Sequence, residues 1–231
     1  MRRGLLSACH AAVLDVLSPP RCAACDAPLD ADGLLCAACD DPVAPVFDQI
    51  DGALVVASGR YGAGTARAIT RFKYASRPDL AGPLAARLFA AASTANLRGP
   101  SLFVPVPLHP ERLARRGYNQ SALLAAQVGR MFGWGVRARA LARTRSTREQ
   151  AALSREERLR NVADAIVPRE RLDSARVVLV DDVVTTGATA LSCLRALSAA
   201  GATEVTILAV ARATLEPDAP TATAGRAFAA P

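Results

Sequence analysis

Aromatic residues and long apolar runs are scarce in this chain of 231 residues. Six Phe, three Tyr and one Trp are too few for the stacking platforms that commonly bind single-stranded nucleic acid. No uninterrupted apolar run approaches the ~18 residues that span a bilayer, so we expect no transmembrane segment. Hydrophobic residues nevertheless make up 51% and charged residues 21% of the chain, which predicts a sizeable core and argues against wholesale disorder.

The N-terminus has the basic start of a secretory signal peptide but lacks its uninterrupted apolar region and its cleavage site. Arg2 and Arg3 precede an apolar stretch that His10 and Asp15 interrupt, and no small-residue cleavage site follows. We expect an amphipathic helix over residues 1–20 instead. Four of the six cysteines form two CxxC pairs, which indicates a metal site in a reducing compartment rather than disulfides, and so a cytoplasmic protein.

The two CxxC pairs flank ten residues rich in Asp, Gly and Pro, in which no helix or strand pattern is visible. Four thiolates at this spacing, from Cys22, Cys25, Cys36 and Cys39, can close a tetrahedral Zn²⁺ site of the ribbon or knuckle type. Because four thiolates fill the tetrahedral coordination of Zn²⁺ and leave no open position, the site would be structural rather than catalytic. An iron–sulfur centre is the alternative.

Charge is divided unevenly along the chain. Residues 1–50 carry a net charge of −4, whereas residues 51–231 carry +11, and residues 112–160 hold twelve arginines and three acids. A basic half of this kind attracts an anion, either nucleic acid or a polyphosphorylated small molecule. The alternative is that these arginines only solvate the surface.

Strands alternate with helices from Gly52 onward. Strands are expected at 54–58, 101–109, 136–141 and 204–211, helices at 65–75, 80–95 and 118–132, and a strand, turn and helix over 175–201. This order predicts an α/β fold with a parallel, doubly wound sheet. The expected organisation is a helix (1–20), a zinc-ribbon-like module with a linker (21–50), the α/β domain (51–213) and a disordered tail (214–231).

The run VVLVDDVVTTGAT at 177–189 carries the clearest chemistry. A buried strand ends at Asp181 and Asp182, on the sheet edge where α/β proteins bind ligands. The loop that follows leads into a helix N-terminus, where backbone N–H groups and the helix dipole favour an anion. We therefore expect an oxyanion cradle beside two carboxylates, which could hold sugar hydroxyls or a Mg²⁺ carried by the ligand. The cradle residues are Thr185, Thr186, Gly187, Ala188 and Thr189.

This run resembles the fingerprint of the type I phosphoribosyltransferases, which bind phosphoribosyl pyrophosphate (PRPP) with Mg²⁺. The resemblance implies that Asp181 and Asp182 hold the ribose hydroxyls and serve as the catalytic pair, while the Thr185–Thr189 loop wraps the 5-phosphate. It also implies that a second loop, with Pro107, Leu108 and His109, holds the pyrophosphate.

Three further segments narrow the resemblance to one family, the ComF competence proteins. They are VPVPLHPERLARRGYNQSALLA (104–125), RTRSTREQAALSREERLRNV (143–162) and the double CxxC. Residues from Arg143 to Arg160 resemble the hood that closes over PRPP, so Arg143, Arg145 and Arg148 would neutralise pyrophosphate; a solvated helix pair is the alternative. Lys73 is the only lysine, and the resemblance favours an anion contact near the cleft over a chance surface position.

Two functions stay open at this point. One is an enzyme that moves the phosphoribosyl group from PRPP to an unidentified acceptor and releases pyrophosphate. The other is a non-catalytic accessory protein of DNA uptake that binds single-stranded DNA or a helicase partner. Purine-salvage enzymes place an Asp where this chain has Thr185, and Arg2 stands where a glutamine-dependent enzyme would have its cysteine. Neither of those activities is expected.

Overall fold

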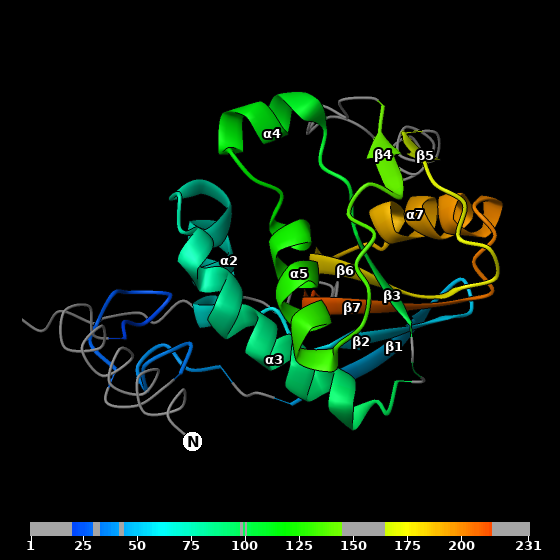
Figure 1. Ribbon diagram of the computed structural model, residues 1–231. Helices are drawn as coiled ribbons and strands as arrows, with labels where there is room; N and C mark the ends of the chain where they lie inside the picture. The colour runs from blue at the N-terminus through cyan, green and yellow to red at the C-terminus, as the bar shows by residue number, and fades with distance from the viewer. Residues whose placement is uncertain are drawn as a thin grey trace, which may run out of the picture.

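A five-stranded sheet forms the centre of the molecule in the computed structural model, which describes residues 20–29, 33–41, 44–97, 99, 101–144 and 165–213 (Figure 1). The strand order is β1-β2-β7-β6-β3. Four strands run parallel and β1 pairs antiparallel with β2, which confirms the expected α/β fold. The strands are β1 (Val46–Ile50), β2 (Ala53–Ala57), β3 (Leu102–Pro105), β6 (Arg176–Val184) and β7 (Glu204–Arg212).

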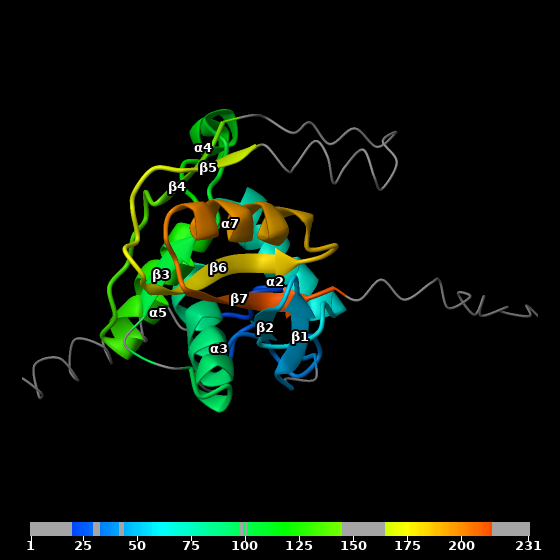
Figure 2. The same cartoon turned by 90° about the vertical axis from the view of Figure 1, so that its right-hand side faces the viewer.

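Helices cover both faces of this sheet (Figure 2). One face carries α2 (Ala63–Tyr74), η1 (Pro78–Leu80), α3 (Ala81–Thr94) and α5 (Gln120–Phe132); the other carries α7 (Ala188–Ala199) and a hairpin of β4 (Leu141–Arg143) and β5 (Ile166–Pro168). The short helix α4 (Pro110–Arg116) lies above the end of the sheet. None of the helices in the described part of the chain is long and apolar enough to cross a membrane.

Side chains of β6 alternate between the two cores. Val178 and Val180 pack in the cluster under α2, α3 and α5, while Val177 and Leu179 pack in the cluster under α7. This is the two-residue period of a strand that is buried on both faces, and it explains why β6 reads as a continuous apolar run. The same period decides where the two acids that follow are directed.

Strand β1 was not expected, because its residues were assigned to the linker that ends at residue 50. It forms a hairpin with β2 through Asp51 and Gly52, which have φ values of 51° and 78°. An Asp-Gly pair with two positive φ angles is a strong hairpin signal, and the sequence contained it. The strand expected at 136–141 is also displaced: Val136 makes one isolated bridge to Phe103, and β4 begins only at Leu141.

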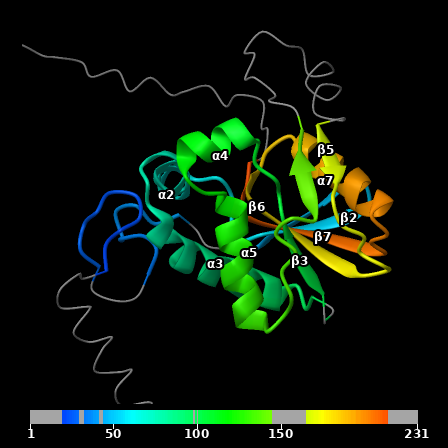
Figure 3. The same cartoon turned by 45° about the horizontal axis from the view of Figure 1, so that its top comes forward.

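The cysteine-containing segment packs against α2, at the opposite end of the molecule from α7 (Figure 3). Its Ala23 and Leu34 are buried in the same cluster as Phe72 and Leu84 of the sheet domain. The carboxylate of Asp41 accepts hydrogen bonds from the backbone N–H of Thr65 at 2.6 Å and of Gly64 at 3.4 Å, and so caps α2. The two parts of the chain therefore share one core.

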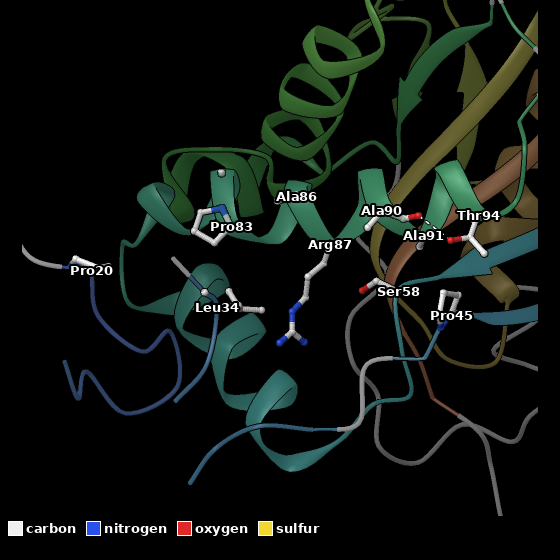
Figure 4. Close-up of a pocket in the computed structure, with 12 residues that line it drawn as sticks. Pro20, Leu34, Pro45, Ser58, Pro83, Ala86, Arg87, Ala90, Ala91 and Thr94 are labelled. Atoms are coloured by element: carbon white, nitrogen blue, oxygen red, sulfur yellow. Dashed lines mark hydrogen bonds between the residues drawn. The ribbon is translucent and has the colours of Figure 1, made fainter. Parts of the chain in front are cut away.

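A groove of about 720 Å³ lies between this segment and α3 (Figure 4). Leu34 and Pro83 form part of its apolar wall, and the side chain of Arg87 extends into it from α3. The residues that line it come from the cysteine-containing segment, α3 and the ends of β1 and β2, and not from β6 or the loop after it. The groove is therefore separate from the candidate site described next.

Candidate functional site

Asp181 and Asp182 lie on β6 just beyond the end of its neighbour β3, whose last paired residue, Pro105, is opposite Val180. Because side chains alternate along a strand, the two carboxylates are directed toward opposite faces of the sheet. Asp182 follows Val178 and Val180 toward α2, and Asp181 follows Val177 and Leu179 toward the α7 face, although its Oδ1 also reaches Ser121 at the start of α5. Adjacent acids in the sequence therefore have different partners.

Asp182 is paired with Lys73, the only lysine in the chain. Lys73 Nζ lies 2.8 Å from Asp182 Oδ1, and the side chain of Asp182 is 8% exposed against 24% for that of Lys73. Burial lowers the pKa of Lys73, but the attraction of Asp182 and Asp181 outweighs it, so the net shift is upward. The ammonium group therefore stays charged and compensates part of the acid pair.

The surroundings of Asp181 disfavour its charged form. Burial raises its pKa to about 7, and the repulsion of Asp182 adds to the effect, while Lys73 opposes it. Its Oδ1 accepts hydrogen bonds from Ser121 Oγ at 3.1 Å and from the backbone N–H of Asp182 at 2.9 Å. Two hydrogen bonds therefore hold the Asp181 carboxyl in place, in surroundings that favour its protonated form.

The loop after β6 turns sharply into α7. Gly187 is the residue before the helix and has a φ of 80°, in the left-handed region that favours glycine, and a Cβ at this position would lie 2.8 Å from Ile50 Cδ1. Thr186 Oγ1 accepts a hydrogen bond of 3.4 Å from the N–H of Ala188, and Thr185 and Thr186 are exposed. The loop thus presents hydroxyls and a helix N-terminus to solvent, as an anion site requires.

Arg212, at the end of β7, fastens this loop to the sheet. Its Nη1 donates to the carbonyl oxygens of Val184, at 3.2 Å, and of Thr185, and its Nε donates to Asp48 Oδ2 at 2.8 Å. The sequence reasoning did not single out Arg212 or Asp48. An arginine at the end of a strand gives no local sign that it will bind the loop after the neighbouring strand in the sheet. Both act on the loop from outside it.

The loop after β3 lies beside the acid pair. The N–H of Val106 donates to the carbonyl of Val180 at 2.9 Å, so Pro107, Leu108 and His109 leave the sheet next to the end of β6. Asn119 Nδ2 donates to the carbonyl of Val106 at 3.0 Å. The predicted pyrophosphate loop and the predicted 5-phosphate loop therefore leave neighbouring strands at the same edge of the sheet.

His109 caps α4: its Nδ1 accepts a hydrogen bond from the backbone N–H of Glu111 at 3.3 Å. Arg143 ends β4, and burial together with the nearby charge of Arg112 lowers its pKa, against the attraction of Asp181. Because Leu141 of β4 packs in the cluster under α7, Arg143 at the end of this strand lies on the face of the sheet toward which Asp181 is directed. Arg145 and Arg148 lie outside the described residues.

One buried donor beside the site has no partner. Among the described residues, Gln120 Nε2 is the buried side-chain polar atom that makes no hydrogen bond. Gln120 begins α5, directly before the Ser121 that bonds Asp181, and its side chain is almost fully buried. A buried amide donor without a partner costs free energy, which makes Gln120 a further candidate for a contact to a ligand. The sequence reasoning did not single it out.

The four cysteines of the CxxC pairs converge, with Sγ atoms that all lie within 4.8 Å of one another. The Sγ atoms of Cys25 and Cys36 are 3.7 Å apart, close to the edge of about 3.8 Å that follows from a tetrahedron with Zn–S bonds of about 2.3 Å. Burial opposes ionisation of Cys22, but backbone N–H groups of Cys36, Ala24 and Cys25 outweigh it and lower its pKa to about 6. This donor set fits a structural Zn²⁺.

Comparisons with known proteins agree with both parts of the chain. Residues 13–50 match the double zinc ribbon domain, and residues 114–226 match the phosphoribosyl transferase domain. The chain is 31% identical to Competence protein F of Haemophilus influenzae over 219 residues, which cover 92% of each chain. It is 34% identical to the DNA utilization protein YhgH of Escherichia coli over 148 residues, which cover 62% of this chain and 65% of the relative.

Among solved structures, the chain is similar to one described as the allosteric regulatory enzyme of purine biosynthesis, with a TM-score of 0.41 and 21% identity over 61% of this chain and 30% of that one.

The sheet, the acid pair with its loop and the four-cysteine cluster define a phosphoribosyltransferase-like protein that carries an N-terminal zinc ribbon. The chain belongs to the ComF family of competence proteins, as its likeness to Competence protein F over nearly the whole length of both chains shows. The resemblance drawn from the sequence is therefore confirmed.

Proposed function

We propose that this protein binds PRPP with Mg²⁺ at the edge formed by the ends of β3 and β6 and transfers its phosphoribosyl group to an acceptor. The observation that supports this most is the acid pair, in which the buried Asp182 is compensated by the charge of Lys73, beside a loop with two exposed threonines that begins a helix. The zinc ribbon is structural in this proposal. A reduced four-thiolate site also supports a cytoplasmic location.

Each part of the edge has one task in the proposed complex. Asp181 and Asp182 hold the ribose hydroxyls, and the loop from Thr185 to Thr189 holds the 5-phosphate at the N-terminus of α7. The loop from Pro107 to His109 faces the pyrophosphate, and Arg143 adds positive charge on the Asp181 side. The Mg²⁺ that accompanies PRPP supplies neutralisation of the pyrophosphate oxygens.

The proposed reaction forms one bond and breaks one. A lone pair on the acceptor attacks C1 of the ribose, the C1–O bond to pyrophosphate breaks, and pyrophosphate leaves with the bonding electrons. Positive charge that develops on the ribose is stabilised by the carboxylates beside it. Thr185 cannot take a proton from the acceptor, so we infer an acceptor that arrives deprotonated or that gives its proton to solvent.

A non-catalytic role in DNA uptake is the second candidate, and the names of the relatives favour it, since they refer to competence and DNA utilization. Arginines that cluster beside the site would then follow a DNA backbone rather than pyrophosphate. The helix α4 alone carries Arg112, Arg115 and Arg116, and Arg116 lies 4.8 Å from the centre of the Tyr74 ring.

Two assays separate these functions. Pyrophosphate release from Mg·PRPP is measured with a panel of candidate acceptors, and single-stranded DNA binding is measured over a range of salt concentrations. Neutralising Arg143, Arg145 and Arg148 should slow release and leave DNA affinity unchanged if they serve pyrophosphate. If they follow DNA, the triple variant should flatten the salt dependence by close to one unit of slope for each phosphate that the protein no longer neutralises, with no release in either protein.

A further inference from the structure

The zinc ribbon is attached to the same helix that carries Lys73. The helix α2 begins at Ala63, where the ribbon's Asp41 caps it, and it ends at Tyr74, one residue after Lys73. A Cβ on Gly64 would lie 1.8 Å from the carbonyl oxygen of Cys39, so the first turn of α2 packs directly against a residue of the metal site. The N-terminal end of the helix is therefore fixed by the ribbon.

The C-terminal end of α2 is held by a second ribbon residue, Asp26. Its carboxylate forms ion pairs with Arg71 and, at 3.0 Å, with Arg77, and Arg71 Nη1 also donates to the carbonyl of Ala23 at 3.2 Å. Arg77 is held in turn by Asp79, whose two carboxylate oxygens lie 2.9 and 3.0 Å from its Nε. Asp26 therefore ties down both sides of the segment in which Lys73 lies.

The position of Asp26 depends on the metal knuckle. It follows Cys25 directly, has a φ of 62°, and its N–H donates to the carbonyl of Cys22 at 2.9 Å. This tight turn joins the two cysteines of the first CxxC pair, so a bound metal that fixes Cys22 and Cys25 also fixes Asp26. Lys73 Nζ in turn forms an ion pair with Asp182 Oδ1 at 2.8 Å. A continuous chain of contacts leads from the ribbon to the acid pair.

We propose that the zinc ribbon positions Lys73: through its clamp on Arg71 and Arg77, Asp26 holds the last turn of α2 where Lys73 reaches Asp182. The inference rests on the proposed PRPP site for its functional consequence, since a displaced Lys73 leaves the acid pair uncompensated. Coupling between two sites is reciprocal, so Mg·PRPP should also slow the loss of zinc to a chelator.

Lys73 offers a direct probe because it is the only lysine. Reductive methylation with ¹³C-formaldehyde labels its ε-amine and the N-terminus alone, and methylation keeps the charge. In zinc-loaded, full-length protein, Asp26→Asn should raise the methylation rate of Lys73 about threefold or more, because an amide cannot pair with the two arginines. Asp26→Glu should restore the parent rate, which a variant with general folding damage would not do.

A matched control is Asp40→Asn, which removes another ion pair between the ribbon and the sheet domain. Asp40 pairs with Arg87 of α3 at 3.4 Å, with a side-chain exposure of 55% against 44% for Asp26, and this contact does not involve α2. The Asp40 variant should leave Lys73 methylation at the parent rate. An Asp26→Asn rate equal to the parent's, or an equal increase in both variants, would overturn the proposal.

Affinity for Mg·PRPP, measured by calorimetry on the same proteins, gives the second readout. Asp26→Asn should weaken binding about fivefold in the parent and have no further effect in a Lys73→Ala background, since the two residues act in series. Additive effects would contradict the series. If the parent itself shows no PRPP binding, the proposed function fails, and the methylation rates still decide whether Asp26 positions Lys73.

Discussion

Replacing Lys73 with Met tests the charge balance of the acid pair. Methionine keeps most of the apolar stem but removes the ammonium that lies 2.8 Å from Asp182 Oδ1. Asp182 is then left with a side-chain exposure of 8% and a second carboxyl next to it. Removing one partner of a buried ion pair typically costs about 3–5 kcal/mol. Because the side chain of Lys73 is 24% exposed, we expect a cost just below that range, about 2–3 kcal/mol.

Urea unfolding of the zinc-saturated protein at pH 8 and pH 5 measures this cost. Protonation of the uncompensated carboxyl removes the buried charge, so the loss of stability caused by Lys73→Met should be largest at pH 8 and should shrink toward pH 5. The double variant Lys73→Met/Asp182→Asn should recover most of the stability at pH 8, because no unpaired charge remains. A loss below about 0.5 kcal/mol, or the same loss at both pH values, would refute the assigned role of the pair.

Three further predictions concern the metal, the loop and the pH dependence of binding. The protein should purify with close to one zinc per chain by elemental analysis, and Cys25→Ser should lose the metal and destabilise the ribbon, since metal binding and folding are coupled. Thr186→Val should weaken binding of ribose 5-phosphate and of PRPP about ten- to hundredfold in calorimetry by removing a donor to the phosphate; unchanged affinity would count against the loop. The pKa of Asp181 is raised to about 7, so its folded-state carboxyl keeps a proton that the unfolded chain loses near pH 4. The free energy of unfolding should therefore fall as pH rises between these two values. Mg·PRPP affinity should rise over the same interval and level off above pH 7, because the ligand needs the charged carboxylate. Two variants are the controls for the pH series. Asp181→Asn should abolish the rise in affinity with pH, and Thr186→Val should keep it.

The sequence predicted the centre of the fold because the local signals and the tertiary structure agree there. The apolar run of β6 followed by two acids and a Thr/Gly turn needs burial on both faces and a helix directly after it, and the structure has both. The hairpin at Asp51 and Gly52 was missed although its turn signal was present. Its first strand has no fully buried residue, and its sequence was interpreted as part of the linker.

The partners across the site could not be predicted in the same way. Lys73 was singled out by its rarity, but its contact with Asp182 joins positions that are far apart in the sequence. The same holds for Arg212 and the loop carbonyls, and for Asp26 and the two arginines that it clamps. Such pairs depend on the order of strands in the sheet and on where the ribbon docks, and no local pattern of residues encodes either.

The most direct test of the account is calorimetric titration of the full-length, zinc-loaded protein with Mg·PRPP, beside the Asp182→Asn variant, with ribose 5-phosphate as a second ligand. Loss of the carboxylate should weaken Mg·PRPP binding about ten- to hundredfold, because a charge-assisted contact is worth about 1.5–3 kcal/mol. Ribose 5-phosphate should be weakened less, since the Thr/Gly loop that holds its phosphate is intact. Equal Mg·PRPP affinity in the parent and the variant, or no binding by the parent, would contradict the assignment of this sheet edge as a PRPP site.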